Sequence, residues 1–152
     1  MIGFGTSCDG QHVTQPSADG MAAAMKNALA SAGVAAGDVD YINAHATATD
    51  IGDVTESQAT LAVFGDRVPI SSTKGHTGHT LGACGGLESA FCLAMMNGGF
   101  LVPTKNLDKP DPRCAPLRYL TNETIDAKDL QIVMNNNFAF GGINTSLLFK
   151  RI

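Results

Sequence analysis

The sequence lacks the features that mark membrane-spanning and nucleic-acid-binding chains. No apolar run reaches the roughly 18 to 20 residues that cross a bilayer, and the most apolar stretch, Leu87 to Met96, contains Glu88. Basic residues are scarce, since 10 Lys and Arg face 14 Asp and Glu, for a formal net charge of −4. Neutralising phosphates needs a clustered basic face. We therefore expect no membrane span and no nucleic-acid partner.

The four cysteines lack a pattern as well. They form no CxxC pair, and no signal-peptide pattern precedes them, since glycine-rich turn sequence follows Met1 directly. Such a chain is expected to keep its thiols reduced, in the cytoplasm or an organelle of similar redox state. Cys84 and Cys92 fall in an expected apolar helix, where free cysteine packs as a small hydrophobe.

What the sequence does contain is a regular alternation of strand and helix signals over 152 residues, enough for one domain with a sizeable core. Helical spacing and end signals predict helices over 17–33, 52–64 and about 80–96. Extended runs predict strands near the start of the chain and over 39–43, 68–72, 131–137 and 143–149, the last two as an antiparallel pair. This order predicts an α/β fold, a mixed five-stranded sheet with helices on its faces.

Two details of this pattern carry further expectations. The first strand opens the chain with nothing before it to pair with, which suggests that further residues precede Met1. The third helix contains Gly82, Gly85 and Gly86 in its first turns, although each costs about 1 kcal/mol relative to alanine. We expect close approach of another backbone or of a ligand there.

Three polar segments follow predicted strands, where α/β folds place their ligands; they span 43–50, 71–79 and 135–144. Singly they are weak signals. A histidine at a strand end is most often a structural hydrogen-bonding residue. His76 and His79 have HxxH spacing but no third metal ligand nearby. Gly141-Gly142 leads into a strand, so the helix dipole that favours phosphate is missing.

Together, the three segments resemble the motifs of the β-ketoacyl-acyl-carrier-protein synthases, the elongating ketosynthases of the thiolase-like superfamily. Asn43 to Thr49 resembles the motif N-x-H-G-T-x-T, and Thr73 to His79 matches T-K-x-x-T-G-H. Asn136 to Asn144 resembles N-S-F-G-F-G-G-x-N. The resemblance runs from Gly3 to Ile152 and implies that residues 1–152 are the C-terminal half of a ketosynthase subunit, with a thiolase-like fold.

The resemblance implies a decarboxylating Claisen condensation, in which malonyl-carrier loses carbon dioxide and the resulting enolate attacks an acyl thioester held on a cysteine. His45 and His79 match the two imidazole donors that stabilise the enolate oxygen. Preorganised donors of this kind contribute about 3 to 4 kcal/mol each, and a neutral imidazole can donate from one nitrogen while a partner holds the other. Lys74 matches the family's active-site lysine.

Acidic residues are expected to support this group. Glu88 matches the carboxylate that pairs with Lys74, and its position inside an apolar helix favours a buried pair, because an unpaired carboxylate would be costly there. Asp53 and Glu56, on the expected helix over 52–64, are further supporting candidates, and Glu56 is expected on the surface of that helix.

The resemblance also assigns the substrate channel. Thr47 and Thr49 match threonines that line the pantetheine channel, and Phe138 and Phe140 belong to the gate. The implied partner is an acyl carrier protein with phosphopantetheine-bound acyl and malonyl groups, and the full-length family member is expected to be a homodimer. No cofactor and no metal is implied. His76 stands where the family varies, which favours a spacer.

The chain departs from residues that are usual in the family at Ala46, Ala48, Asp50, Ala139 and Ile143. An alanine where φ is positive would strain the backbone or stiffen a loop. These departures bear on chain-length preference and on the mobility of the gate.

No cysteine in this chain fits the nucleophile, which in this family stands at a sharp strand-to-helix turn. We therefore expect the nucleophile-bearing half to precede Met1, and this chain to be inactive in condensation alone. An alternative is a non-catalytic partner of the chain-length-factor type, although such partners often lose residues that are retained here. A thiolase proper fits less well, because thiolases lack the T-K-x-x-T-G-H pattern.

Overall fold

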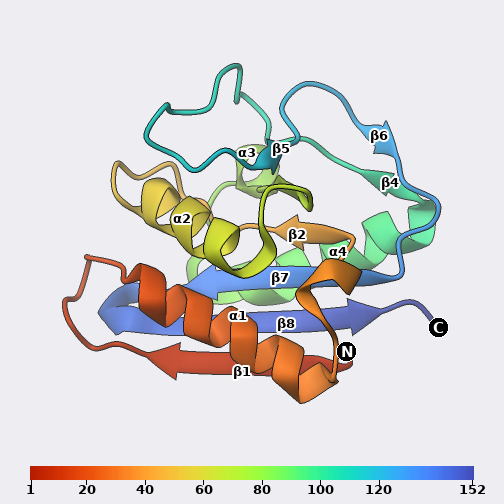
Figure 1. Cartoon of the computed structure of the whole chain (residues 1–152). Helices are drawn as coiled ribbons and strands as arrows, with labels where there is room; N and C mark the ends of the chain where they lie inside the picture. Colours follow the sequence, from red (N-terminus) through yellow and green to blue (C-terminus); the bar gives the residue numbers. More distant parts are fainter.

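The computed structural model describes all residues from 1 to 152 and contains a mixed sheet of six strands, in the order β1-β8-β7-β2-β3-β5 (Figure 1). A second, two-stranded sheet pairs β4 with β6. The strands are β1 (Gly3–Cys8), β2 (Tyr41–Asn43), β3 (Pro69–Ser71), β4 (Phe100–Leu101), β5 (Arg118–Tyr119), β6 (Ile125–Asp126), β7 (Ile132–Phe138) and β8 (Ile143–Lys150).

Four strands of the large sheet, β7, β2, β3 and β5, run parallel, whereas β8 and β1 join antiparallel at one edge. The predicted α/β class and the antiparallel pair of β7 and β8 are confirmed. The expected five strands become six because β5, only two residues long, forms in the proline-rich connection by pairing with β3. A two-residue strand has no sequence period of its own, so a pattern of alternation cannot reveal it.

The first strand has its partner within the chain. β1 pairs with β8 along its whole length, from Gly3 opposite Leu148 to Cys8 opposite Ile143. β1 therefore needs no earlier residues as a pairing partner, because a strand can pair with one that follows much later in the chain.

The helices are α1 (Ala18–Ala32), α2 (Gly52–Phe64), the short α3 (Lys74–Thr77) and α4 (Cys84–Gly98). Ser17 caps α1 by accepting a hydrogen bond from the Gly20 N–H, and Gly33 ends it in the left-handed conformation, both as predicted. The third predicted helix begins later than expected, because Leu81–Ala83 form a 3₁₀ turn before α4. No helix is long and apolar enough to span a bilayer.

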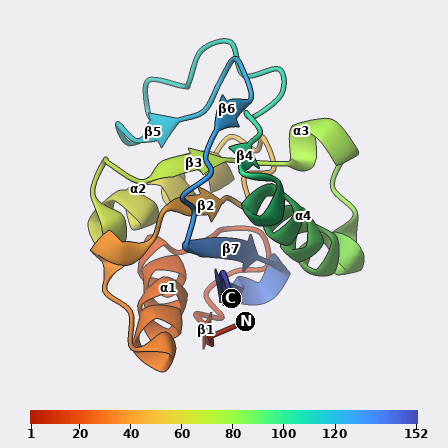
Figure 2. The same ribbon diagram turned by 90° about the vertical axis from the view of Figure 1, so that its right-hand side faces the viewer.

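Helices cover both faces of the large sheet, with α1 and α2 on one side and α4 on the other (Figure 2). Successive residues of β7 alternate between the two cores, so that Met134 packs with α1 while Val133 packs with α4. Gly5 brings β1 close to α1, because a Cβ atom there would lie 2.1 Å from the Ala24 carbonyl oxygen. The central strands are thereby fixed from both sides, and their carboxyl ends hold the polar segments.

Candidate active site

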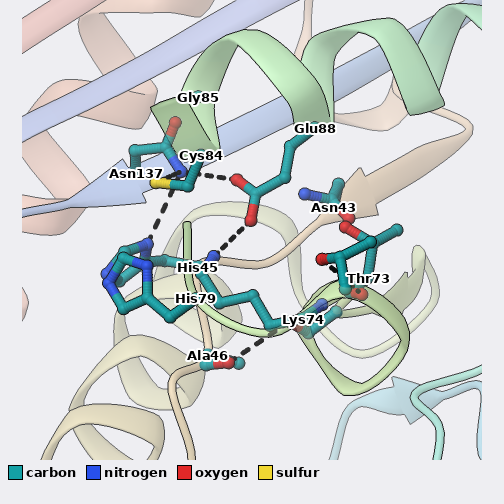
Figure 3. Close-up of polar contacts among 12 residues, drawn as sticks. Asn43, His45, Ala46, Thr73, Lys74, His79, Cys84, Gly85, Glu88 and Asn137 are labelled. Atoms are coloured by element: carbon teal, nitrogen blue, oxygen red, sulfur yellow. Dashed lines mark hydrogen bonds and ion pairs between the residues drawn. The ribbon is translucent and has the colours of Figure 1, made fainter. Parts of the chain in front are cut away.

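The three polar segments meet at the carboxyl ends of three neighbouring parallel strands. β2 lies between β7 and β3, and all three run parallel, so their carboxyl ends point the same way. His45 follows β2, Lys74 and His79 follow β3, and Phe138 ends β7. Figure 3 shows that His45, Lys74 and His79 lie close together.

His45 and His79 face each other edge to face, with ring centroids 5.3 Å apart and ring planes at 87°. The Leu81 N–H donates to His79 Nδ1 at 3.1 Å, which leaves the proton of a neutral His79 ring on Nε2. Burial, with the neighbouring Lys74 and His79, lowers the pKa of His45 to about 3. His45 is therefore a neutral imidazole near pH 7. The Phe138 ring packs at 6.3 Å from it.

Lys74 and Glu88 form the buried ion pair that the sequence predicted. Lys74 is the first residue of α3 and Glu88 lies on α4, with side chains 6% and 3% exposed. A pair so far from water is held tightly, because removing either partner would leave the other charge buried and uncompensated. The pair therefore fixes α4 against the segment that carries His79.

Asn137 joins this ion pair to His45, and sequence reasoning missed it. Its Nδ2 donates to Glu88 Oε2 at 2.7 Å and lies 3.5 Å from His45 Nδ1 (Figure 3). One signal could have found it, since Asn137 stands where the resembled motif has serine. Lys74, Glu88, Asn137 and His45 thus form one continuous polar chain.

Glu56 is buried, which contradicts the expectation that it lies on the helix surface. Its two carboxyl oxygens accept hydrogen bonds from the backbone N–H groups of His45 and Ala46, at 2.9 and 2.7 Å. Desolvation nevertheless raises the pKa of Glu56 to about 7. α2 packs against the loop after β2, a tertiary contact that the sequence pattern of the helix does not contain.

Asp53 holds the next part of the same loop. Its Oδ1 accepts from the Ala48 N–H at 3.1 Å, and burial raises its pKa. Two acidic side chains one helical turn apart on α2 therefore bind the backbone of residues 45–48. Both side chains therefore shape this loop.

The loop also carries backbone strain. Ala46 has a φ of 20° and Ala48 a φ of 58°. Both alanines therefore have the positive φ at which a side chain strains the backbone. Ala139 differs, because its φ is −99° and the positive φ values of that segment fall on Gly141 and Gly142. The alanine in the gate segment is thus unstrained.

Two cavities, of about 820 and about 830 Å³, share the 45–49 loop as a wall. We call the first the histidine cavity; it is lined by His45, His79 and the predicted channel and gate residues Thr47, Thr49, Phe138 and Phe140. The second is lined by Lys74 and shares His79, Thr47 and Thr49 with the first. The threonine hydroxyls lie 3.3 Å apart.

The four cysteines are free thiols, and their places differ. Cys84 is the first residue of α4 and lines the histidine cavity, but burial and the nearby Glu88 raise its pKa, the opposite of what an activated thiolate needs. Cys92 is buried among apolar side chains, Cys8 is exposed at the end of β1, and Cys114 lies in the proline-rich connection.

His76 and His79 have separate partners. His76 Nε2 lies 3.0 Å from the Pro103 carbonyl oxygen, so its ring points toward that connection. His79 instead faces His45. The structure contains no group of three or more His, Cys, Asp or Glu side chains placed to hold a metal ion.

Comparison with protein families matches residues 1–108 to the model described as "Beta-ketoacyl synthase, C-terminal domain". Among curated proteins, the chain is 42% identical to 3-oxoacyl-[acyl-carrier-protein] synthase 1 of Haemophilus influenzae, over 99% of this chain and 36% of that protein. It is 40% identical to the synthase 1 of Escherichia coli, over 100% and 36%. The chain thus spans just over a third of the length of these relatives.

Solved structures of ketosynthases have the same fold over nearly the whole of this chain. A β-ketoacyl synthase from Burkholderia phymatum superposes with a TM-score of 0.96 at 55% identity, covering 99% of this chain and 37% of that one. The ishigamide ketosynthase/chain length factor superposes with a TM-score of 0.95 at 39% identity, with the same coverage. The predicted thiolase-like fold is therefore confirmed.

Proposed function

Because the chain belongs to the β-ketoacyl synthase family, as its C-terminal domain, we propose that it supplies the histidine half of a condensing site. The reaction is the decarboxylating condensation of an acyl thioester with a malonyl thioester on acyl carrier protein, in fatty acid or polyketide elongation. Residues 1–152 form this half as one domain.

The observation that carries the proposal is the pair of imidazoles that line one cavity, with ring centroids 5.3 Å apart. When malonyl thioester loses carbon dioxide, the electron pair of the broken carbon–carbon bond moves into an enolate whose oxygen becomes negative. His45 and His79 donate to that oxygen from Nε2. Donors already aimed at the position where charge develops need no reorganisation during the reaction.

Lys74 acts with Glu88 to hold these donors in place, and Asp53 and Glu56 hold the backbone around His45. Thr47 and Thr49 line the channel for the phosphopantetheine arm, with hydroxyls that can bind its amides. Phe138 and Phe140 gate the histidine cavity. One solved relative is described as a type II PKS acyl-carrier protein in complex with its ketosynthase, which supports acyl carrier protein as the partner.

The nucleophilic cysteine comes from a further segment, and the complete subunit works as a homodimer in the cytoplasm, where thiols stay reduced. Four side chains that line the histidine cavity are apolar and more than half exposed, which suits a surface covered by such a segment. They are Val13, Ile51, Leu81 and Phe140.

A second candidate is a non-catalytic partner of the chain-length-factor type. The description of the ishigamide ketosynthase/chain length factor favours keeping it. The presence of His45, Lys74 and His79 favours the enzyme. The residue at the strand-to-helix turn of the segment that completes the site distinguishes them, because cysteine there supports the enzyme and glutamine supports the partner.

The test is malonyl decarboxylation by this chain joined to a nucleophile-bearing ketosynthase half. His79→Ala is expected to lower the rate by about 10²- to 10³-fold, because one donor to the enolate oxygen is lost. His76→Ala is the matched control, since His76 is exposed and binds only the Pro103 carbonyl, and it should leave the rate unchanged. Equal rates for both variants would refute the role of His79.

A further inference from the structure

Asn137 is the one polar side chain that contacts both the buried ion pair and a histidine of the site. It lies near the end of β7, one residue before Phe138, and its amide is partly buried against the first turn of α4. We propose that Asn137 is a positioning residue that fixes the Nε2–H tautomer of His45, with its amide oriented by the Lys74–Glu88 pair. The importance of this tautomer rests on the proposed function.

The orientation of the Asn137 amide follows from Glu88. Asn137 Nδ2 lies 2.7 Å from Glu88 Oε2, while Glu88 Oε1 is taken by the Lys74 ammonium group. If the amide were rotated by half a turn, its oxygen would face the carboxylate oxygen, and two acceptors would repel. The Lys74–Glu88 pair therefore decides which end of the amide faces the site.

The orientation of the amide in turn decides where His45 carries its proton. An NH₂ group has two donors, and with one directed to Glu88 the other can point to His45 Nδ1 at 3.5 Å. A proton on Nδ1 would place two donors face to face, so a neutral His45 carries its proton on Nε2. His79 reaches the same tautomer by another route, because a backbone N–H occupies its Nδ1. Two different contacts thus give both rings an Nε2 donor.

Gly85 provides the space that the Asn137 side chain needs. A Cβ atom at Gly85 would lie 2.5 Å from Asn137 Oδ1. The other atom close to it, at 3.5 Å, also belongs to the Asn137 side chain. Gly82 and Gly86, by contrast, have no atom within 4 Å of such a Cβ atom. The close approach expected of the glycines therefore exists at Gly85 only, and the group that approaches is the amide of Asn137.

Nitrogen-15 NMR of the histidine rings in this chain tests the proposal directly, because long-range ¹H–¹⁵N correlations distinguish a protonated ring nitrogen from a bare one. In the unmodified chain, His45 should show a bare Nδ1 and a protonated Nε2 at neutral pH. Asn137→Leu keeps the branched shape and removes the contacts of the amide nitrogen with Glu88, His45 and Cys84. The His45 Nδ1 resonance should then shift toward the protonated position, because the Nδ1–H tautomer becomes populated.

His76 is the internal control, since its Nε2 contacts the Pro103 carbonyl and no part of Asn137. Its ring resonances should not move, which also reports that the variant is folded. Gly85→Ala is the second variant and disturbs Asn137 from the α4 side, without removing any polar group and with a gain in helix propensity. It should give the same shift at His45, and adding Asn137→Ser should remove the clash. A His45 ring that stays fully Nε2–H in both Asn137→Leu and Gly85→Ala overturns the proposal.

Kinetics of the completed protein separate positioning from a merely structural role. Asn137→Leu should lower kcat for decarboxylation about tenfold with little change in KM, as loss of a group that orients an active-site histidine typically does. In a His45→Ala background the same substitution should have no further effect, because its target is gone. An equal effect in both backgrounds would contradict the role. The NMR measurement does not depend on decarboxylation. The positioning role of Asn137 and the role of His79 in decarboxylation can therefore be refuted separately.

Discussion

Two buried carboxylates at this site have different kinds of partner. Glu88 has a lysine partner, whereas Glu56 has only two backbone N–H groups. Hydrogen bonds to the backbone favour the charged form, but desolvation outweighs them at Glu56 and its pKa rises to about 7. The loop after β2 is therefore held by a group that changes charge near neutral pH.

Protonation of His45 should make the chain less stable in acid. The unfolded chain binds a proton at this ring near pH 6.5 and the folded chain only near pH 3. Between these values the unfolded state holds more protons, so the free energy of unfolding rises with pH and this contribution is lost as pH falls. Between pH 5 and pH 7, the free energy of unfolding should rise by about 2 kcal/mol less in His45→Gln than in the unmodified chain. Urea denaturation at the two pH values measures this. Parallel pH profiles for the two proteins would contradict the lowered pKa.

Which residues the sequence could predict depends on where their partners lie. The pairing of Lys74 with Glu88 was predictable from the family resemblance, and the apolar helix around Glu88 supported it, because an unpaired carboxylate is costly there. Glu56 was misplaced because α2 has the composition of a helix with one polar face, and only the fold shows that the loop after β2 covers it. Asn137 was missed because asparagine is ordinary in a strand, and its role comes from Glu88 on α4.

At the level of single elements, α1 shows how local signals fix a boundary. Ser17 accepts the Gly20 N–H at 3.2 Å, and Gly33 closes the helix with a φ of 65°. Both signals lie within a few residues of the ends that they set, so the sequence predicted them correctly. α4 differs, because the turn at Leu81–Ala83 and the φ of 53° at Leu81 arise from the path between His79 and the sheet.

Removal of the α1 cap should destabilise the chain measurably. Ser17→Ala leaves an N–H in the first helical turn without its acceptor and should lower the free energy of unfolding by about 1 kcal/mol. Ser31→Ala is the control in the same helix, since Ser31 is exposed near the other end. Alanine there should be neutral or stabilising by up to about 0.5 kcal/mol. Equal losses in the two denaturation curves would mean that Ser17 does not act as a cap.

On the scale of the whole molecule, one sheet separates two cores that share no side chain. Ile42 belongs to the core under α1 and α2, and Phe149 to the core under α4. β2 and β8 are separated by β7, which places them about 10 Å apart. The α/β order along the chain predicted this layering, because each crossover helix has to cover a face of the sheet.

Substitutions in the two cores should therefore add. Ile42→Val and Phe149→Leu each remove a small buried volume and should each cost about 1 kcal/mol. The double variant should cost the sum to within about 0.5 kcal/mol, since the two side chains lie in separate cores on opposite faces of the sheet. Denaturant titration of the four proteins measures this. A larger discrepancy would show that the sheet transmits strain from one core to the other.

The strained loop after His45 has a practical consequence for anyone who surveys this site by mutagenesis. Ala46 and Ala48 have backbone conformations that alanine rarely adopts, with φ values of 20° and 58°. An alanine scan, the usual first survey, leaves both residues unchanged and records nothing at them. Here the informative replacement is glycine, which removes the conformational penalty while altering no functional group.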